Sequence, residues 1–198
     1  MYKVFVEQFD VLPPINQKEA LRYAGVRGVA KDGLNALFEE CLQEASEAFC
    51  GKVCYCKCSV SELFDAIPIA AQSKSLRVAL AGCESVIVFA ATVGLGIDRL
   101  MQRYLRLSPT KSLLFQALGA ERIEAVCDLF CERLKQDYRA ANYTLKPRFS
   151  AGYGDFPLEA QKAIFALLSA SKNIGVSLTE SLMMIPTKSV SALIGVKG

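Results

Sequence analysis

The chain has 198 residues, of which 52% are apolar and 22% charged, as expected for a globular protein with a sizeable buried core. Its formal net charge of +3 is too small to indicate a nucleic-acid or membrane partner. Histidine is absent, which removes the commonest general base, the Ser–His and Cys–His nucleophile pairs and the usual catalytic zinc ligand. Any chemistry must therefore rely on positioning, on carboxylates and lysines, or on a cofactor.

The N-terminal sequence MYKVFVEQFD lacks the apolar core of a signal peptide. The longest apolar run, residues 86–97, is shorter than the roughly 18–20 residues that a membrane helix requires. We therefore expect a cytoplasmic protein whose eight cysteines are free thiols in a reducing compartment.

The first half of the chain predicts alternating short strands and helices. Residues 2–9 alternate apolar and polar side chains, which favours a strand, and Asn16 is a plausible N-cap for a helix that ends near Gly25. Apolar residues recur at helical spacing over 34–49. The remaining elements expected in this half are a strand at 52–59, a helix near 61–71 that is interrupted by Pro68, and a buried central strand at 85–92.

The second half is dominated by a long helix that starts at Ser108–Pro109 and runs to about residue 138, with a possible break at Gly119. The other expected elements are a helix at 97–105, an extended or turn-like segment at 149–153, a helix at 157–168, and strands within 175–178 and 183–195. No regular βα repeat is present. We predict an α+β fold, a single mixed domain over 1–198 with a mainly antiparallel twisted sheet flanked by helices. A helical N-terminal part of about 1–50 is expected to pack on it.

A glycine pair follows the predicted central strand in the segment ATVGLGIDRL. Gly94 and Gly96 precede a helix, and the N-terminus of a helix can bind phosphate. However, Arg99 replaces the third glycine of a dinucleotide-binding fingerprint, and Asp98 adds negative charge. A tight strand-to-helix turn is the favoured interpretation.

Four cysteines cluster at Cys50, Cys54, Cys56 and Cys58, which raises the possibility of an iron–sulfur site. Their spacing matches no usual cluster motif. On a strand the last three would share one face at steps of about 7 Å, too far apart to hold one metal without a bend. Thiols packed as small apolar side chains are therefore favoured, and an iron–sulfur protein would instead be coloured.

The segment RFSAGYG, residues 148–154, has the composition of a ligand-binding loop. Arg148 offers a planar fork for a carboxylate, glycine allows close approach of the backbone, and Tyr153 offers a flat face and a hydroxyl. These groups suit a ligand with a carboxylate and an aromatic ring. A structural loop with an exposed arginine is the alternative, and composition alone favours it.

The R-x-S-x-G-Y pattern resembles the R-x-x-x-G-Y motif of the activation domain of cobalamin-dependent methionine synthase. Two further blocks of that domain, Gly-x-x-Leu-Thr-Glu-Ser and Pro-x-x-Ser-Val-Ser, resemble the segment from Gly175 to Ser191, and residues 123–138 resemble its preceding long helix. The resemblance is clear over 115–195. The first half is more similar to short, stand-alone activation proteins of the family. The family's proline before Gly-Tyr is Ala151 here.

The resemblance implies a site for S-adenosylmethionine without catalytic residues or a metal. By position, Arg148 would hold the ligand's carboxylate and Glu124 would face its ammonium group, while the Gly-Tyr pair would lie along it. Ser150 and the strand at Met183 would supply backbone hydrogen bonds to the adenine side. The full implied set is Arg148, Ser150, Gly152, Tyr153, Glu124 and Met183.

The resemblance also implies a reaction, the reductive methylation of cob(II)alamin that reactivates methionine synthase. A sulfonium leaving group and a reduced cobalt nucleophile require no protein acid or base, which agrees with the absence of histidine. The chain is too short for the homocysteine, folate and cobalamin modules. The expected partners are a corrinoid-bearing methionine synthase that lacks this domain, which carries the cobalamin, and a flavodoxin-like or ferredoxin-like electron donor. A non-catalytic adaptor of the same fold for another corrinoid methyltransferase is the alternative.

Overall fold

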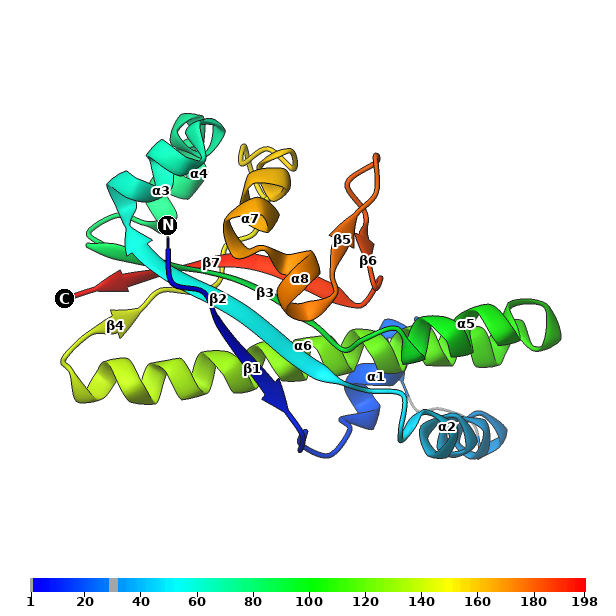
Figure 1. Cartoon of the computed structure of the whole chain (residues 1–198). Coiled ribbons are helices and arrows are strands. Elements are labelled where there is room, and N and C mark those ends of the chain that lie inside the picture. Colours follow the sequence, from blue (N-terminus) through cyan, green and yellow to red (C-terminus); the bar gives the residue numbers. More distant parts are fainter. Residues whose placement is uncertain (1, 29–31) are drawn as a thin grey trace.

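The computed structural model describes residues 2–28 and 32–198. Its centre is a five-stranded antiparallel sheet with helices on both faces (Figure 1). The order across the sheet is β1-β2-β3-β7-β4. These strands are β1 (Phe5–Phe9), β2 (Gly51–Ser59), β3 (Ser85–Thr92), β7 (Ser189–Lys197) and β4 (Thr144–Leu145). The predicted α+β class, with an antiparallel sheet flanked by helices, is confirmed.

One face of the sheet is covered by the long helix α6 and three helices around it (Figure 1). They are α1 (Gln17–Tyr23), α2 (Asp32–Ala45), α5 (Gly96–Leu107) and α6 (Pro109–Ala140). Alternate residues of β3, such as Ile87 and Phe89, point toward this layer and pack with Phe130 of α6. α1 and α2 pack mainly on α6.

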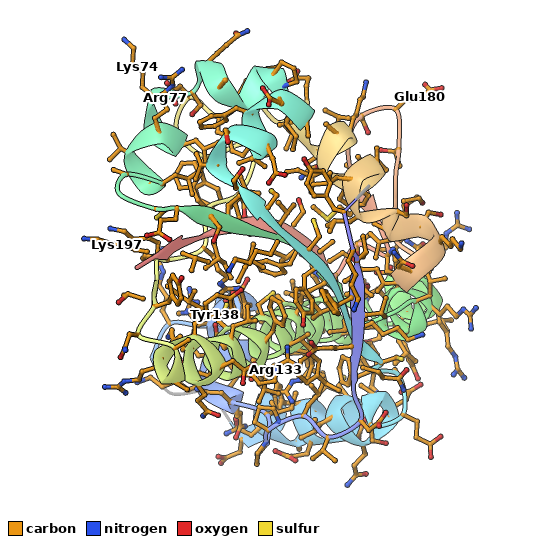
Figure 2. The ribbon with its side chains drawn as sticks, turned by 60° about the vertical axis from the view of Figure 1, so that its left-hand side comes forward. Lys74, Arg77, Arg133, Tyr138, Glu180 and Lys197 are labelled. Atoms are coloured by element: carbon orange, nitrogen blue, oxygen red, sulfur yellow. The ribbon has the colours of Figure 1, made fainter. Side chains whose placement is uncertain are left out.

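The opposite face is covered by shorter helices (Figure 1). They are α3 (Val60–Ala66), the 3-10 turn η1 (Pro68–Gln72), α4 (Lys74–Ala79), α7 (Ala160–Leu168) and α8 (Ala170–Ile174). The other alternate residues of β3, Val86, Val88 and Ala90, point into this second core. β3 is thus buried on both faces, which explains its continuous apolar sequence, and Figure 2 shows side chains filling the space on both sides of the sheet.

Local signals in the sequence explain several helix ends. The Asn16 side chain accepts a hydrogen bond from the Glu19 N–H at 3.2 Å, which confirms the expected N-cap. The interruption expected at Pro68 is confirmed, because α3 ends before this residue and η1 begins there. α6 continues through Gly119 without a break. A Cβ at this glycine would lie 2.8 Å from Lys188 Cγ, so glycine leaves room for the Lys188 side chain to pass over the helix.

The glycine turn between β3 and α5 is a packing contact. Gly94 has φ +83°, which favours glycine, and a Cβ on Gly96 would lie 2.2 Å from the Ala48 carbonyl oxygen. Asp98 accepts hydrogen bonds from the backbone N–H and the hydroxyl of Thr187. The turn therefore holds together segments that are distant in sequence, in line with the favoured interpretation as a structural turn.

The cysteines of β2 lie in the core. Cys54, Cys56 and Cys58 share the face toward the shorter helices, and all three are buried. Burial raises the pKa of Cys54 to about 12 and that of Cys56 to about 11, so these thiols remain protonated. Among residues 2–28 and 32–198, no group of three or more Cys, Asp or Glu side chains is arranged to hold a metal ion.

A small hairpin leads into the last strand. It consists of β5 (Ser177–Leu178) and β6 (Met184–Ile185), and Figure 2 shows Glu180 at its tip, away from the sheet. Over the described ranges, no helix is long and apolar enough to cross a membrane.

Candidate functional site

A cavity of about 390 Å³ opens where β7 is flanked by α6 and α7. Its volume lies within the range of about 300–1,000 Å³ that is usual for small-molecule sites. Three segments that are far apart in sequence form its wall: α6, the region 148–161, and the end of the chain from β6 into β7. The lining residues are Glu124, Arg148, Phe149, Ser150, Tyr153, Gln161, Met184, Ser189, Val190, Ser191 and Ala192.

Phe149 anchors the first part of the RFSAGYG segment to the edge of the sheet. Its N–H donates to the Leu193 carbonyl at 2.9 Å, and the Leu193 N–H donates back at 2.8 Å. Its ring stacks on buried Phe156 with centroids 6.2 Å apart. Because side chains alternate along an extended segment, Arg148 and Ser150 are directed to the other side of the segment from Phe149.

The Gly-Tyr pair forms a tight turn at the mouth of the cavity. Gly152 has φ +92°, and its N–H donates to the Phe156 carbonyl at 2.8 Å. Gly152 therefore shapes the turn and is absent from the cavity wall. Tyr153 follows with a ring that is 66% exposed and lies 6.4 Å from the Phe149 ring, so its flat face is accessible at the rim.

Asp155 fastens this turn to the start of α4. Its carboxylate accepts hydrogen bonds from the Ser73 hydroxyl at 2.7 Å and from the N–H groups of Lys74 and Ser75, both at 2.9 Å. The Ser73 hydroxyl and these two N–H groups hold the pKa of Asp155 well below its usual range. Gly154 allows the close approach, since a Cβ there would lie 2.5 Å from Ser75 Oγ.

Charge in the site is concentrated on one arginine and two carboxylates of α6. Arg148 Nη2 lies 3.2 Å from Glu124 Oε2 and 2.9 Å from Asp128 Oδ1. Burial alone would lower the pKa of Arg148, but Cys127, Glu124 and other acidic neighbours outweigh it and raise that pKa. Burial in turn raises the pKa of Cys127 to about 12, so the three charged groups carry a net charge of −1.

Two residues of the cavity wall each carry a buried polar atom without a partner. Gln161 of α7 is 6% exposed and Ser191 of β7 is 2% exposed. Within the described part of the chain, Gln161 Oε1 and Ser191 Oγ have no hydrogen-bond partner. A buried polar atom left unsatisfied costs about 1–3 kcal/mol, so these two positions are candidates for a hydrogen bond to a bound molecule.

The structure brings together four of the six residues implied by the family resemblance. Glu124, Arg148, Ser150 and Tyr153 line the cavity, and Gly152 shapes the turn. Met183 does not line it.

Met184 takes the place expected for Met183, whose side chain is 62% exposed. The Met183 N–H donates to Thr179 Oγ1 and its carbonyl accepts from the Thr179 N–H, so both backbone groups are used within the hairpin. A ligand contact at Met183 stays a prediction, although its backbone groups are hydrogen bonded within the hairpin and Met184 is the methionine that lines the cavity. Alternation along β6 turns the next residue inward instead.

Sequence reasoning missed the contribution of α7 and of Asp155. Gln161 shares a buried helix face with Phe165 and Leu168, and a glutamine in such an apolar stripe was the available signal. Asp155 gave no comparable signal, because its partners on α4 are about 80 residues earlier in the chain.

Comparisons with known proteins show the family of the chain. Residues 76–197 match a family model described as "Vitamin B12 dependent methionine synthase, activation domain", and this span includes every residue of the cavity wall. Among solved structures, the "MetH Reactivation Domain bound to AdoHcy" is similar, with a TM-score of 0.65 and 17% identity, over 96% of this chain and 78% of that one. No curated protein matches the chain. The family match covers more than half of the sequence, and the chain belongs to the vitamin B12-dependent methionine synthase activation domain family.

Proposed function

We propose that the chain binds S-adenosylmethionine in the cavity between α6 and α7 and supports the reductive reactivation of cobalamin in a methionine synthase. The observation that carries the proposal is the ion pair of Arg148 and Glu124 in the wall of a cavity that is also lined by Gln161 and Ser191, two residues with an unsatisfied buried polar atom. The family membership and the AdoHcy bound to the similar MetH domain support the same ligand class.

The charges of the site complement those of the ligand. S-adenosylmethionine carries a carboxylate, an ammonium and a sulfonium group, and its net charge is +1. Both α6 carboxylates contact the same Arg148 nitrogen, Nη2, so the remaining guanidinium N–H groups are free of hydrogen bonds to the described residues. They would pair with the ligand carboxylate, and Glu124 would pair with its ammonium.

The chain's own part in methyl transfer would be binding and orientation. Arg148 and Glu124 would hold the amino-acid end, and the exposed Tyr153 ring would cover the ligand at the rim, where the methyl group must remain accessible. The corrinoid of the partner, after one-electron reduction, would supply a cobalt nucleophile that takes the methyl group and releases S-adenosylhomocysteine. No proton has to be moved, so the acceptor and donor groups of this site suffice.

The proposed partners follow from this reaction. The corrinoid is held by a methionine synthase that lacks an activation domain, and a flavodoxin-like or ferredoxin-like protein donates the electron. Such a system operates in the cytoplasm.

Isothermal titration with S-adenosylmethionine, in the presence and absence of the corrinoid protein, tests the proposal. We expect binding by the wild-type chain, and a loss of about 10- to 100-fold in affinity for Arg148→Ala, as for removal of a charged hydrogen bond. Arg139→Ala, at an exposed arginine in the last turn of α6, is the matched control and should leave affinity unchanged.

Reactivation is measured by the absorbance of the partner's corrinoid under a one-electron donor. With Arg148→Ala, the absorbance of the corrinoid should change more slowly than with the wild-type chain, because less S-adenosylmethionine is bound. Failure of the wild-type chain to bind S-adenosylmethionine even with the corrinoid protein present contradicts the proposal. Unchanged reactivation with Arg148→Ala would instead indicate an adaptor role.

A further inference from the structure

We infer that Gln161 and Ser191 hydrogen bond the adenosyl group of the ligand and thereby select for a nucleoside-bearing compound. The inference rests on the proposed function and extends it to two side chains. It is drawn from two residues that line one cavity and are more than nine-tenths buried, and whose polar atoms Gln161 Oε1 and Ser191 Oγ are without a hydrogen-bond partner among the described residues.

Both residues occupy positions that packing alone would fill with apolar side chains. Gln161 belongs to the buried face of α7 with Ile164, Phe165 and Leu168. Ser191 begins the fully buried stretch of β7 and lies on the same face as Leu193, since side chains two residues apart on a strand share a face. A methyl or methylene group at either place would avoid the cost of an unsatisfied polar atom.

The backbone of Ser191 adds a donor and an acceptor beside these side chains. The N–H and C=O of Leu193 face Phe149. Because residues two apart on a strand direct their backbone groups to the same side, the N–H and C=O of Ser191 point to this same edge of β7. Beyond Phe149 the neighbouring segment leaves this edge, because the Gly152 N–H bonds to the Phe156 carbonyl instead. Among the described residues, no backbone hydrogen bond joins residues 150–152 to β7.

This polar edge suits a purine nucleoside. An adenine ring presents a row of donors and acceptors along its rim and two flat faces, and ribose adds hydroxyl groups. The Ser191 backbone pair, the Ser191 hydroxyl and the Gln161 amide offer matching groups. The rings of Phe149 and Tyr153, both in the cavity wall, offer flat surfaces for stacking.

The charged residues and the polar pair lie on opposite sides of the sheet edge. Glu124 and Arg148 are joined on the α6 side. Ser191 shares its face with Leu193, which belongs to the core under α7, and Gln161 projects from α7 itself. A ligand with an amino-acid end and a nucleoside end would thus span the edge of β7, with one end at each set of residues.

The test uses the full chain and titration calorimetry with S-adenosylhomocysteine, which is stable and lacks the reactive methyl group. Ser191→Ala and Gln161→Met remove the polar atoms at similar volume. Each should raise the Kd by about three- to tenfold, as for loss of one neutral hydrogen bond. In competition experiments, adenosine should displace S-adenosylhomocysteine less effectively from both variants than from the wild-type chain. Methionine should displace it equally well from all three.

Ser171→Ala, at an exposed serine of α8 outside the cavity wall, is the control for loss of a serine hydroxyl. This variant should keep both its Kd and its melting temperature. Without ligand, Ser191→Ala and Gln161→Met should keep or raise the melting temperature, which shows that their weaker binding is not a folding defect.

The outcomes separate this inference from the proposed function. If the wild-type chain binds S-adenosylhomocysteine and both variants bind it equally well, the polar pair does not contact ligand and the inference is overturned while the proposed function stands. A selective loss of methionine competition would also overturn it, because it would place the pair at the amino-acid end. If the wild-type chain binds no S-adenosylhomocysteine, both fail together.

Discussion

Among single residues, Asp155 shows how one exposed carboxylate positions a binding loop. It joins the Gly-Tyr turn to the start of α4 through the Ser73 hydroxyl and two backbone N–H groups. Ser73 also caps α4 by accepting from the Leu76 N–H at 3.0 Å, so one network orders both the helix start and the turn. The placement of Tyr153 at the cavity rim depends on this network.

Asp155→Asn is expected to lower the melting temperature at pH 7. The folded-state pKa of Asp155 lies below the ordinary value of about 3.9, so its ionised form stabilises the fold at every pH above that value. This contribution is lost as the pH falls from about 4 through the folded-state pKa. The difference in melting temperature between wild type and variant should therefore shrink below about pH 4.

Thermal unfolding followed by circular dichroism across this pH range provides the measurement. Asp65→Asn, at an exposed carboxylate on α3 that accepts no hydrogen bond from the described residues, is the control and should show little difference at any pH. A difference for Asp155→Asn that stays constant down to pH 2.5 would contradict the assigned role of the charge.

At the scale of secondary-structure elements, the turn between β3 and α5 determines how three segments meet. Gly96 lies against the backbone of Ala48, which precedes β2, and Asp98 in the first turn of α5 holds Thr187 before β7. The glycine at the start of α5 is therefore required by a backbone contact. The same contact explains why a glycine pair after a buried strand need not indicate a phosphate site.

Gly96→Ala is expected to destabilise the fold by about 1–3 kcal/mol, because the added Cβ would lie 2.2 Å from a carbonyl oxygen and force the backbone apart. Gly33→Ala is the matched control within α2. A Cβ there has no atom within 4 Å, so helix propensity should stabilise this variant by up to about 1 kcal/mol. Urea unfolding of both variants gives the comparison, and equal free energies would contradict the packing argument.

At the scale of the whole molecule, α6 connects the N-terminal segment, the sheet and the candidate site. On one side Glu124 reaches Arg148, and one turn earlier Glu121 and Arg122 form a buried ion pair. Glu121 accepts from the Asn16 N–H at 3.0 Å, and Arg122 donates to the Pro13 carbonyl at 2.6 Å. The segment before α1 is thereby bound to the helix that forms the site.

Glu121→Gln is expected to destabilise the fold by about 3 kcal/mol, because Arg122 would remain buried without its charge partner. Glu132→Gln is the matched control, since Glu132 pairs with Lys135 on the same helix at an exposed position, where an ion pair contributes less than about 1 kcal/mol. Denaturant unfolding measures both. A small effect at Glu121 would indicate that this segment is held by apolar contacts alone.

The sequence by itself determined those features that depend on residues close to one another along the chain. The N-cap at Asn16, the doubly buried strand at 85–92 and the long helix before Arg148 all follow from local periodicity or from one side chain near its own backbone. The residue types around Arg148 also predicted a contact with a carboxylate, and the family resemblance implied that Glu124 of the preceding helix belongs to the same site; the two side chains lie 3.2 Å apart.

Only the tertiary structure decided which residues meet at the cavity. Phe149 pairs with Leu193 across more than 40 residues, and Gln161 reaches the site because α7 packs over β7 beside it. Met184 rather than Met183 faces inward because a one-residue shift in a two-residue strand reverses every side chain, and local pattern is too short there to set the register. Unsatisfied hydrogen bonds are likewise a property of packing, so Gln161 and Ser191 became candidates for ligand contacts only once their surroundings were known.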